Sequence, residues 1–138
     1  MNNDDWKQNV SGKLIVLDGP DGCGKTTQSK LLTQWLQAEG VPARNFRDPG
    51  NTTIGEHIRD ILLSPEHLAM ATRTEILLYM AARSQLWHER IAPALRENES
   101  VVLDRWVSST CAYQGHAGGF AATAIDYHQG KIALALVE

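Results

Sequence analysis

The run Gly19-Pro20-Asp21-Gly22-Cys23-Gly24-Lys25-Thr26-Thr27 decides the fold of this chain. It fits the pattern G-x-x-x-x-G-K-[ST], in which a glycine-rich loop binds phosphate groups. An apolar run at residues 14–17 precedes the loop and is typical of a buried strand, and residues 29–39 have the pattern of an amphipathic helix. Because the motif requires a strand before it and a helix after it, this context predicts a nucleotide-phosphate site.

The residue types of the loop suit phosphate chemistry. Its glycines let the backbone curl so that successive N–H groups point at one anion, and the start of the following helix adds its positive end. Lys25 can reach the β- and γ-phosphates of ATP, and the hydroxyl of Thr26 is placed to bind Mg²⁺. A plain glycine-rich turn is the alternative, but such a turn has no need of Lys-Thr at this spacing. The predicted ATP-binding residues are Gly19, Pro20, Asp21, Gly22, Cys23, Gly24, Lys25, Thr26 and Thr27.

Length and composition limit the class of protein. The chain has 138 residues, which is enough for one domain with a real core, and a net charge of −3, which argues against nonspecific nucleic-acid binding. The two cysteines, Cys23 and Cys111, form no disulfide framework or metal-ligand pattern, so we expect a cytoplasmic protein. Residues 1–12 are polar and resemble neither a signal peptide nor a membrane span. We therefore expect a disordered leader at 1–12 and one domain at 13–138.

The rest of the chain alternates strand and helix patterns, which predicts an α/β fold with a parallel sheet. The predicted strands cover residues 13–18, 43–46 and 100–104. The predicted helices cover residues 27–39, 53–63, 72–91, 108–113 and 121–137. Thr53 with Glu56, and Thr72 with Glu75, have the spacing of a capping box and predict two helix starts. Pro93 is expected to break or kink the long helix.

A second group of candidate residues follows the predicted strands. Asp104 ends the third strand, where a carboxylate beside a phosphate-binding loop can support Mg²⁺, although an aspartate at the start of a turn is the plain alternative. Arg105 follows at once and can bind two oxygens of a second phosphate. Arg47 follows the second strand and is expected to point into the same crevice.

Tyr79 and Arg83 lie four residues apart, on one face of a predicted helix. An aromatic ring one turn from a guanidinium group suits a flat base, because the ring stacks on it and the arginine donates to a carbonyl. The ordinary interpretation is that Tyr79 belongs to the core and that Arg83 is a solvated helix charge. The spacing alone favours this ordinary interpretation.

Taken together, the motifs resemble those of bacterial thymidylate kinases, which are P-loop nucleoside monophosphate kinases. The resemblance covers residues 13–115. The segments that carry it are Leu17-Asp18-Gly19-Pro20-Asp21-Gly22-Cys23-Gly24-Lys25-Thr26-Thr27-Gln28, Arg47-Asp48-Pro49-Gly50-Asn51-Thr52, Tyr79-Met80-Ala81-Ala82-Arg83, Asp104-Arg105-Trp106 and Ala112-Tyr113-Gln114-Gly115. At residues 47–52 the family usually has Arg-Glu-Pro-Gly-Gly-Thr, so this chain departs from the family pattern at Asp48 and Asn51.

The resemblance implies a P-loop NTPase-type three-layer α/β/α fold and transfer of the ATP γ-phosphate to dTMP, giving dTDP, with Mg²⁺. It implies catalytic roles for Lys25, Asp104 and Arg105, and metal binding by Thr26 and Asp104. The substrate-binding residues that it implies are Asp21 at the sugar 3′-hydroxyl, Arg47 and Arg105 at the acceptor phosphate, Tyr79 stacked on thymine, Arg83 at its carbonyl edge and Gln114 near the base.

Departures from the family pattern bear on activity. Gly22 stands where some members carry an arginine, and members with glycine there supply an arginine from a mobile lid. The chain reaches Glu138, about where the family would begin its fourth strand, so we expect the domain at 13–138 to be the N-terminal two-thirds of a P-loop kinase domain, without the last two strands and the lid. Little activity is expected from such a chain.

The expected partners are ATP and dTMP, without nucleic acid or membrane. We expect a homodimer if the fold is completed, and otherwise association through an open sheet edge. Two other functions fit the sequence: a noncatalytic nucleotide-binding fragment, or another P-loop kinase for a deoxynucleoside or small molecule.

Overall fold

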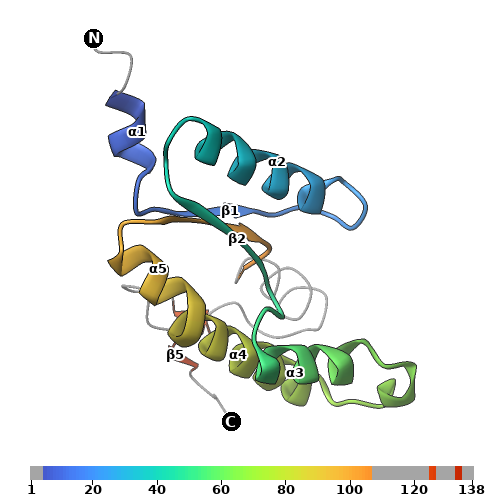
Figure 1. Ribbon diagram of the computed structural model, residues 1–138. Coiled ribbons are helices and arrows are strands. Elements are labelled where there is room, and N and C mark those ends of the chain that lie inside the picture. Colours follow the sequence, from blue (N-terminus) through green and yellow to red (C-terminus); the bar gives the residue numbers. More distant parts are fainter. Residues whose placement is uncertain (1–4, 107–124, 127–132, 135–138) are drawn as a thin grey trace.

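The computed structural model describes residues 5–106, 125–126 and 133–134 (Figure 1). Its strands are β1 (Leu14–Leu17), β2 (Ala43–Arg47), β3 (Ser100–Asp104), β4 (Ile125–Asp126) and β5 (Ala133–Leu134). Its helices are α1 (Asp5–Val10), α2 (Lys25–Ala38), α3 (Thr53–Leu63), the 3₁₀ turn η1 (Pro65–His67), α4 (Thr72–Leu86), the π-helical segment η2 (Trp87–Ile91) and α5 (Ala92–Arg96). None of the helices described is both long and apolar enough to span a bilayer.

The central sheet is parallel and has the strand order β1-β3-β2, which confirms the predicted parallel sheet. Leu17 of β1 and Arg47 of β2 both stand in register with Asp104 of β3, so the three strands end at one edge. All five residues of β3 are buried, as expected for the central strand of a sheet covered on both faces. This common edge is where ligand-binding side chains gather in parallel sheets.

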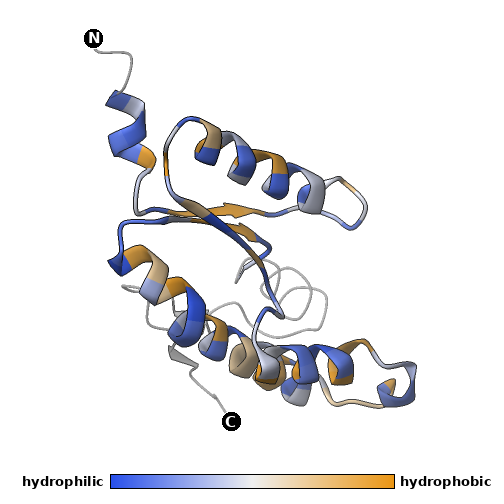
Figure 2. Ribbon diagram, viewed as in Figure 1, coloured by the Kyte–Doolittle hydropathy of each residue, from blue (hydrophilic) through white to orange (hydrophobic). Residues whose placement is uncertain are grey.

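Helices cover both faces of the sheet and form three layers (Figure 1). Val101 and Leu103 of β3 pack with residues of α4, η2 and α5, whereas Val102 packs with Leu36 of α2. This alternation follows from the two-residue period of a strand. Hydrophobic residues are concentrated in β1 and β3, while β2 and the helices carry many hydrophilic residues (Figure 2). Each face of the sheet therefore has its own apolar cluster.

The N-terminal segment differs from the disordered leader that the composition predicted, because residues 5–10 form helix α1. Trp6 and Val10 lie four residues apart, on one side of this short helix, and pack against the cluster under α2. The Trp6 ring stacks on Trp35 of α2, with 4.8 Å between ring centroids, and Ser100 donates a hydrogen bond from Oγ to the carbonyl oxygen of Val10. Two apolar side chains therefore anchor a segment that is otherwise polar.

The N-terminus of α3 differs from the predicted capping box. The N-cap is Thr52 rather than Thr53, and its Oγ1 accepts a hydrogen bond from the Gly55 backbone at 2.9 Å. Glu56 is not the reciprocal partner of the cap, because its Oε1 accepts from the backbone N–H of Asn51. The physical reason is the extended conformation of Thr52, which ends the preceding loop one residue earlier than the pattern indicated.

The predicted helix at 72–91 forms but is not α-helical to its end. It begins after Ala71 without a side-chain cap, so the Thr72–Glu75 pattern is not used. The last turn widens into η2, where the Ala92 N–H donates to the carbonyl of Trp87, five residues back. Pro93 follows directly, and a proline ring clashes with the carbonyl four residues before it, which favours such a widened turn.

The helix predicted at 121–137 is also not observed where the structure describes that segment. Residues 125–126 and 133–134 form the antiparallel pair β4–β5, with Ile125 opposite Leu134. The sequence between these strands contains Gly130, and a glycine inside a helix costs about 1 kcal/mol relative to alanine. The predicted helix at 108–113 lies outside the described residues.

Candidate functional site

The glycine-rich loop joins β1 directly to the N-terminus of α2. Gly22 and Gly24 have φ angles of 77° and 93°, in the left-handed region that residues with a Cβ rarely adopt. Gly24 is the residue before the helix, and α2 begins at Lys25. The loop therefore delivers the positive end of a 14-residue helix to the common edge of the sheet, as the motif predicted.

Lys25 bends back over the loop. Its Nζ donates to the carbonyl oxygen of Pro20 at 2.5 Å and lies 3.7 Å from Sγ of Cys23. Cys23 is exposed and is a free thiol. Among the described residues, the ammonium group contacts this carbonyl and this sulfur and no carboxylate, so on an exposed loop it can turn to an anion at little cost.

A cavity of about 390 Å³ opens where the loop meets the ends of β2 and β3. It brings together the loop, the start of α2 and side chains from three separate segments. Its lining residues are Asp21, Gly22, Gly24, Lys25, Thr26, Thr27, Arg47, Asp48, Arg59, Asp104 and Arg105. Both predicted phosphate-binding arginines thus share one cavity with the loop lysine.

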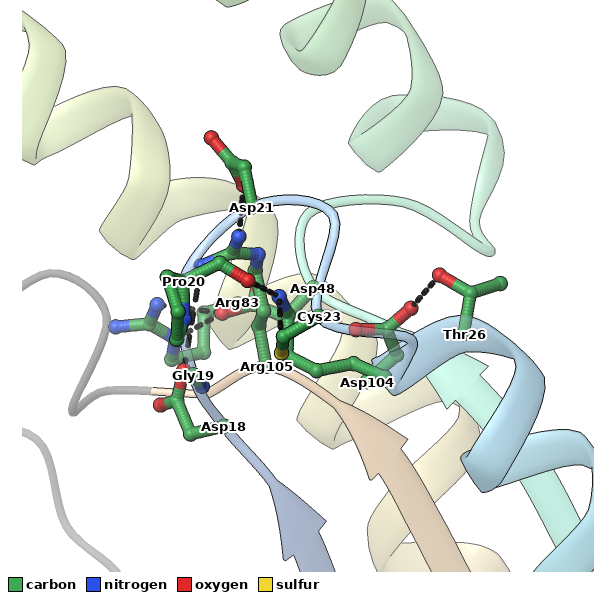
Figure 3. A network of polar contacts seen from close by, with 11 residues as sticks. Asp18, Gly19, Pro20, Asp21, Cys23, Thr26, Asp48, Arg83, Asp104 and Arg105 are labelled. Carbon is green, nitrogen blue, oxygen red and sulfur yellow. Dashed lines mark hydrogen bonds and ion pairs between the residues drawn. The ribbon is translucent and has the colours of Figure 1, made fainter.

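Thr26 and Asp104 lie next to each other in the wall of this cavity. The Thr26 hydroxyl donates to Oδ2 of Asp104, across 78 residues of sequence (Figure 3). Asp104 is buried, with 8% of its surface exposed. A hydroxyl and a carboxylate side by side are the oxygen ligands that Mg²⁺ accepts, and this ion usually takes its other ligands from water and substrate phosphates. The two predicted metal-binding residues fit Mg²⁺.

Arg105 and Asp21 form an exposed ion pair across the cavity mouth. Arg105 donates from Nη2 to Oδ1 of Asp21, and its Nη1 lies 4.0 Å from Oδ1 of Asp18. The Asp21 side chain is 87% exposed. Arg105 has a φ of 72°, a strained conformation for a residue with a side chain, of a kind that clusters at ligand-binding sites. Asp21, which we expected at a sugar hydroxyl, therefore pairs with Arg105 in this structure.

Arg47, at the end of β2, is held by the first turn of α3 and by the loop that precedes it. Its Nη2 donates to both carboxylate oxygens of Glu56, at 3.0 and 2.8 Å. The backbone N–H of Asn51 lowers the pKa of Glu56 most, and Arg47 lowers it further. Asn51 has a φ of 61°, which asparagine tolerates, and its Oδ1 accepts from the Arg47 N–H at 2.6 Å. Asn51 therefore joins the end of β2, where Arg47 lies, to the following loop through this hydrogen bond.

Arg83 is not the solvated helix charge that the spacing favoured. It is 1% exposed, and both Nε and Nη2 donate to Oδ2 of Asp48. Burial raises the pKa of Asp48 above its ordinary value, and the guanidinium of Arg83 opposes that rise. Tyr79, one turn earlier on α4, is half-buried, and burial raises the pKa of its hydroxyl. Neither Tyr79 nor Arg83 lines the cavity, whereas Asp48 does.

Asp48 is the residue of this region that sequence reasoning missed. It belonged to a motif, but no pattern assigned it a partner, because the pairing with Arg83 spans 35 residues. Its place directly after a strand, beside Arg47, was the available signal. Gln114 and Cys111 lie outside the described residues.

The comparisons of this chain with known proteins all point to the same family. The family model for thymidylate kinase matches residues 17–131. The chain is 48% identical over 106 residues to a thymidylate kinase of Cutibacterium acnes, covering 77% of this chain and 52% of that protein. It is 48% identical over 110 residues to a thymidylate kinase of Caldanaerobacter subterraneus subsp. tengcongensis, covering 80% and 52% of the two chains.

A solved structure, that of a thymidylate kinase from Ehrlichia chaffeensis, is also similar, with a TM-score of 0.75 and 33% identity. The match covers 82% of this chain and 61% of that one. This likeness confirms the predicted P-loop fold class. The chain spans about half the length of the curated relatives that it matches.

Proposed function

The chain belongs to the thymidylate kinase family, and from this premise we propose that it serves the transfer of the ATP γ-phosphate to dTMP, giving dTDP. The observation that carries the proposal is the shared cavity. It holds the loop lysine, a hydroxyl–carboxylate pair and both predicted phosphate-binding arginines within one space of about 390 Å³. Phosphoryl transfer needs positioning and charge neutralisation more than covalent chemistry, and these residues supply both.

On the donor side, the loop N–H groups and the α2 N-terminus hold the ATP phosphates, and Lys25 leaves Pro20 to bind them. Thr26 and Asp104 hold Mg²⁺, which neutralises the negative charge of the phosphates when bound. Because the Thr26 hydroxyl already donates to Asp104, the two groups stand close enough to act on one ion.

On the acceptor side, Arg47 and Arg105 bind the phosphate of dTMP. Each is paired with a carboxylate, Glu56 or Asp21, on the exposed side of the site, where a phosphate can compete for the guanidinium. A planar guanidinium can bind phosphate and carboxylate along different edges. From the family resemblance we propose that Tyr79 stacks on the base and that Arg83 donates to its carbonyl, although neither side chain lines the cavity in this structure. Gln114 remains a proposed base contact from the family resemblance.

We also propose a cytoplasmic location, because the exposed thiol of Cys23 suits a reducing compartment. Among the described strands, β1 pairs only with β3, and its Val16 is 37% exposed. This edge supports pairing with a further strand, of this polypeptide or of a second copy. A noncatalytic nucleotide-binding role shares all of these features and differs only in turnover.

The test is calorimetric binding of Mg²⁺–ATP to the wild-type chain and to Lys25→Ala. We expect the affinity to fall at least about tenfold, because a charged donor leaves the phosphate site. Lys30→Ala, on the exposed surface of the same helix, is the matched control and should bind as the wild type does. Unchanged ATP affinity in Lys25→Ala would refute the phosphate site. A coupled assay of dTMP-dependent ADP formation then separates the kinase from the noncatalytic alternative.

A further inference from the structure

A fully buried ion pair stands behind the acceptor side of the cavity. It joins Asp48, the residue after β2, to Arg83 in the second half of α4 (Figure 3). Arg83 donates from Nε at 2.8 Å and from Nη2 to the same oxygen, Oδ2. Each side chain is 1% exposed. Because Asp48 also lines the cavity, this carboxylate connects the cavity wall with helix α4.

The guanidinium of Arg83 is restrained on an edge and on a face. Asp48 holds the edge formed by Nε and Nη2, and the ring of Trp106 lies along the face, 5.1 Å from the guanidinium carbon to the ring centroid. Trp106 itself packs against Trp87, with 6.4 Å between ring centroids. A planar group held on one edge and one face cannot rotate without breaking a hydrogen bond. On its other side, Nη1 lies 3.9 Å from Sδ of Met80. Asp48 and Trp106 therefore set the direction of the guanidinium together with this contact from α4.

We propose that Asp48 is a positioning residue that fixes the direction of Arg83 and thereby makes the acceptor site select a pyrimidine carbonyl over an amino group. This inference rests on the proposed function, in which Arg83 reads the base. Arginine carries donors only, so it binds a carbonyl oxygen and opposes an amino group. That opposition discriminates only when the guanidinium cannot turn away from the wrong base. The Asp48 carboxylate supplies the restraint.

The second oxygen of Asp48 supports a functional reason for the pair. Oδ1 is buried and has no hydrogen-bond partner among the residues that the structure describes. A buried carboxylate oxygen without a donor costs stability, and a buried ion pair is seldom more stable than an apolar replacement. Features that lower the folding stability locally in this way are typical of functional sites. The pair therefore has a better explanation in positioning than in folding stability alone.

The experiment compares binding of dTMP, dCMP and Mg²⁺–ATP to the wild-type chain and to three variants. Asp48→Asn keeps the shape and removes the charge, and Asp48→Glu keeps the charge. Asp60→Asn, on the exposed face of α3, is the matched control. We expect Asp48→Asn to weaken dTMP binding roughly tenfold, to change dCMP little and to leave ATP unchanged. Asp48→Glu should retain most of the preference for dTMP.

A readout on Arg83 itself makes the test independent of turnover and of ligand. In a ¹⁵N–¹H spectrum of the arginine Nε–H groups, the Arg83 proton should exchange slowly in the wild type and in Asp48→Glu, and rapidly in Asp48→Asn. The double variant with Asp48→Asn and Arg83→Gln removes both charges, and it should fold and bind dTMP and dCMP with similar affinity. This double variant replaces Asp48→Asn in the binding test if the single variant does not fold.

The outcomes separate the two proposals. If the wild type prefers dTMP and Asp48→Asn keeps that preference, or loses ATP and dTMP affinity equally, the positioning role is wrong while the proposed function stands. If Arg83 exchange is the same in the wild type and in Asp48→Asn, the positioning role is wrong as well. If the wild type shows no preference between dTMP and dCMP, base reading by Arg83 fails, and the positioning proposal fails with it.

Discussion

Two ion pairs border the same cavity and differ in almost every physical respect. Arg105 and Asp21 meet at its mouth, with side chains 20% and 87% exposed, whereas Arg83 and Asp48 lie behind its wall at 1% each. Water and salt screen the first pair, so giving up one carboxylate for a phosphate costs little. Separating the second pair would leave an uncompensated charge in the interior. The comparison indicates that exchangeable charges face the ligand and fixed charges support them.

The largest effect should come from breaking the buried pair. Arg83→Leu leaves the Asp48 carboxylate without its partner, and we expect the free energy of unfolding to fall by about 3–5 kcal/mol. Urea unfolding followed by circular dichroism measures this. Arg90→Leu, which removes an exposed arginine that pairs with Glu89, is the control and should change stability by less than about 1 kcal/mol. Similar losses in the two variants would contradict the distinction between the pairs.

The exposed pair should show the opposite pattern. Arg105→Gln is expected to change the free energy of unfolding by less than about 1 kcal/mol. It should nevertheless weaken dTMP binding about tenfold or more, because a charged donor to the phosphate is lost. Calorimetric titration of thymidine alongside dTMP isolates the phosphate contribution, since thymidine affinity should not change. A large loss of stability with unchanged dTMP affinity would reverse the assignment of the two pairs.

A chemical probe can sharpen the description of the cavity mouth. Cys23 is exposed and lies 3.7 Å from Nζ of Lys25, in the loop that we propose to hold ATP phosphates. Alkylation of Cys23 in a Cys111→Ser background should slow several-fold when Mg²⁺–ATP is added. Lys25→Ala should lose most of that protection at the same ATP concentration. Protection that persists in Lys25→Ala would show that ATP covers the thiol without the loop lysine.

The smallest effect concerns pH and the contacts that hold Arg47 at the end of β2. The Asn51 backbone N–H and Arg47 lower the pKa of Glu56 below its ordinary value of 4.5. The contribution of Glu56 to stability is therefore complete above pH 4.5 and is lost as the pH falls through the lowered pKa. Urea midpoints of the wild type and Glu56→Gln should differ at neutral pH and converge in acid. A difference that is constant down to acid pH would contradict the ionic role of Glu56.

Local features of the site could be predicted well. The loop motif, the helix that follows it and the carboxylate at the end of β3 are each encoded within a few residues, and the structure places them together at one sheet edge. The sequence misled where a partner was distant. Arg83 resembled a surface charge because its helix spacing says nothing about Asp48, and residues 5–10 resembled a disordered segment because their partner, Trp35, lies on another helix.

The sequence by itself determined the phosphate-binding loop, the alternation of strands and helices, and the family. These follow from short-range constraints: glycines that permit left-handed backbone, a lysine at a set distance from them, and apolar periods of two or 3.6 residues. Only the tertiary structure decided which charge is paired with which. The order β1-β3-β2 and the packing of α4 bring Arg105 to Asp21 across 84 residues and Arg83 to Asp48 across 35. The free energy of such a pair depends on its burial, which no local pattern encodes.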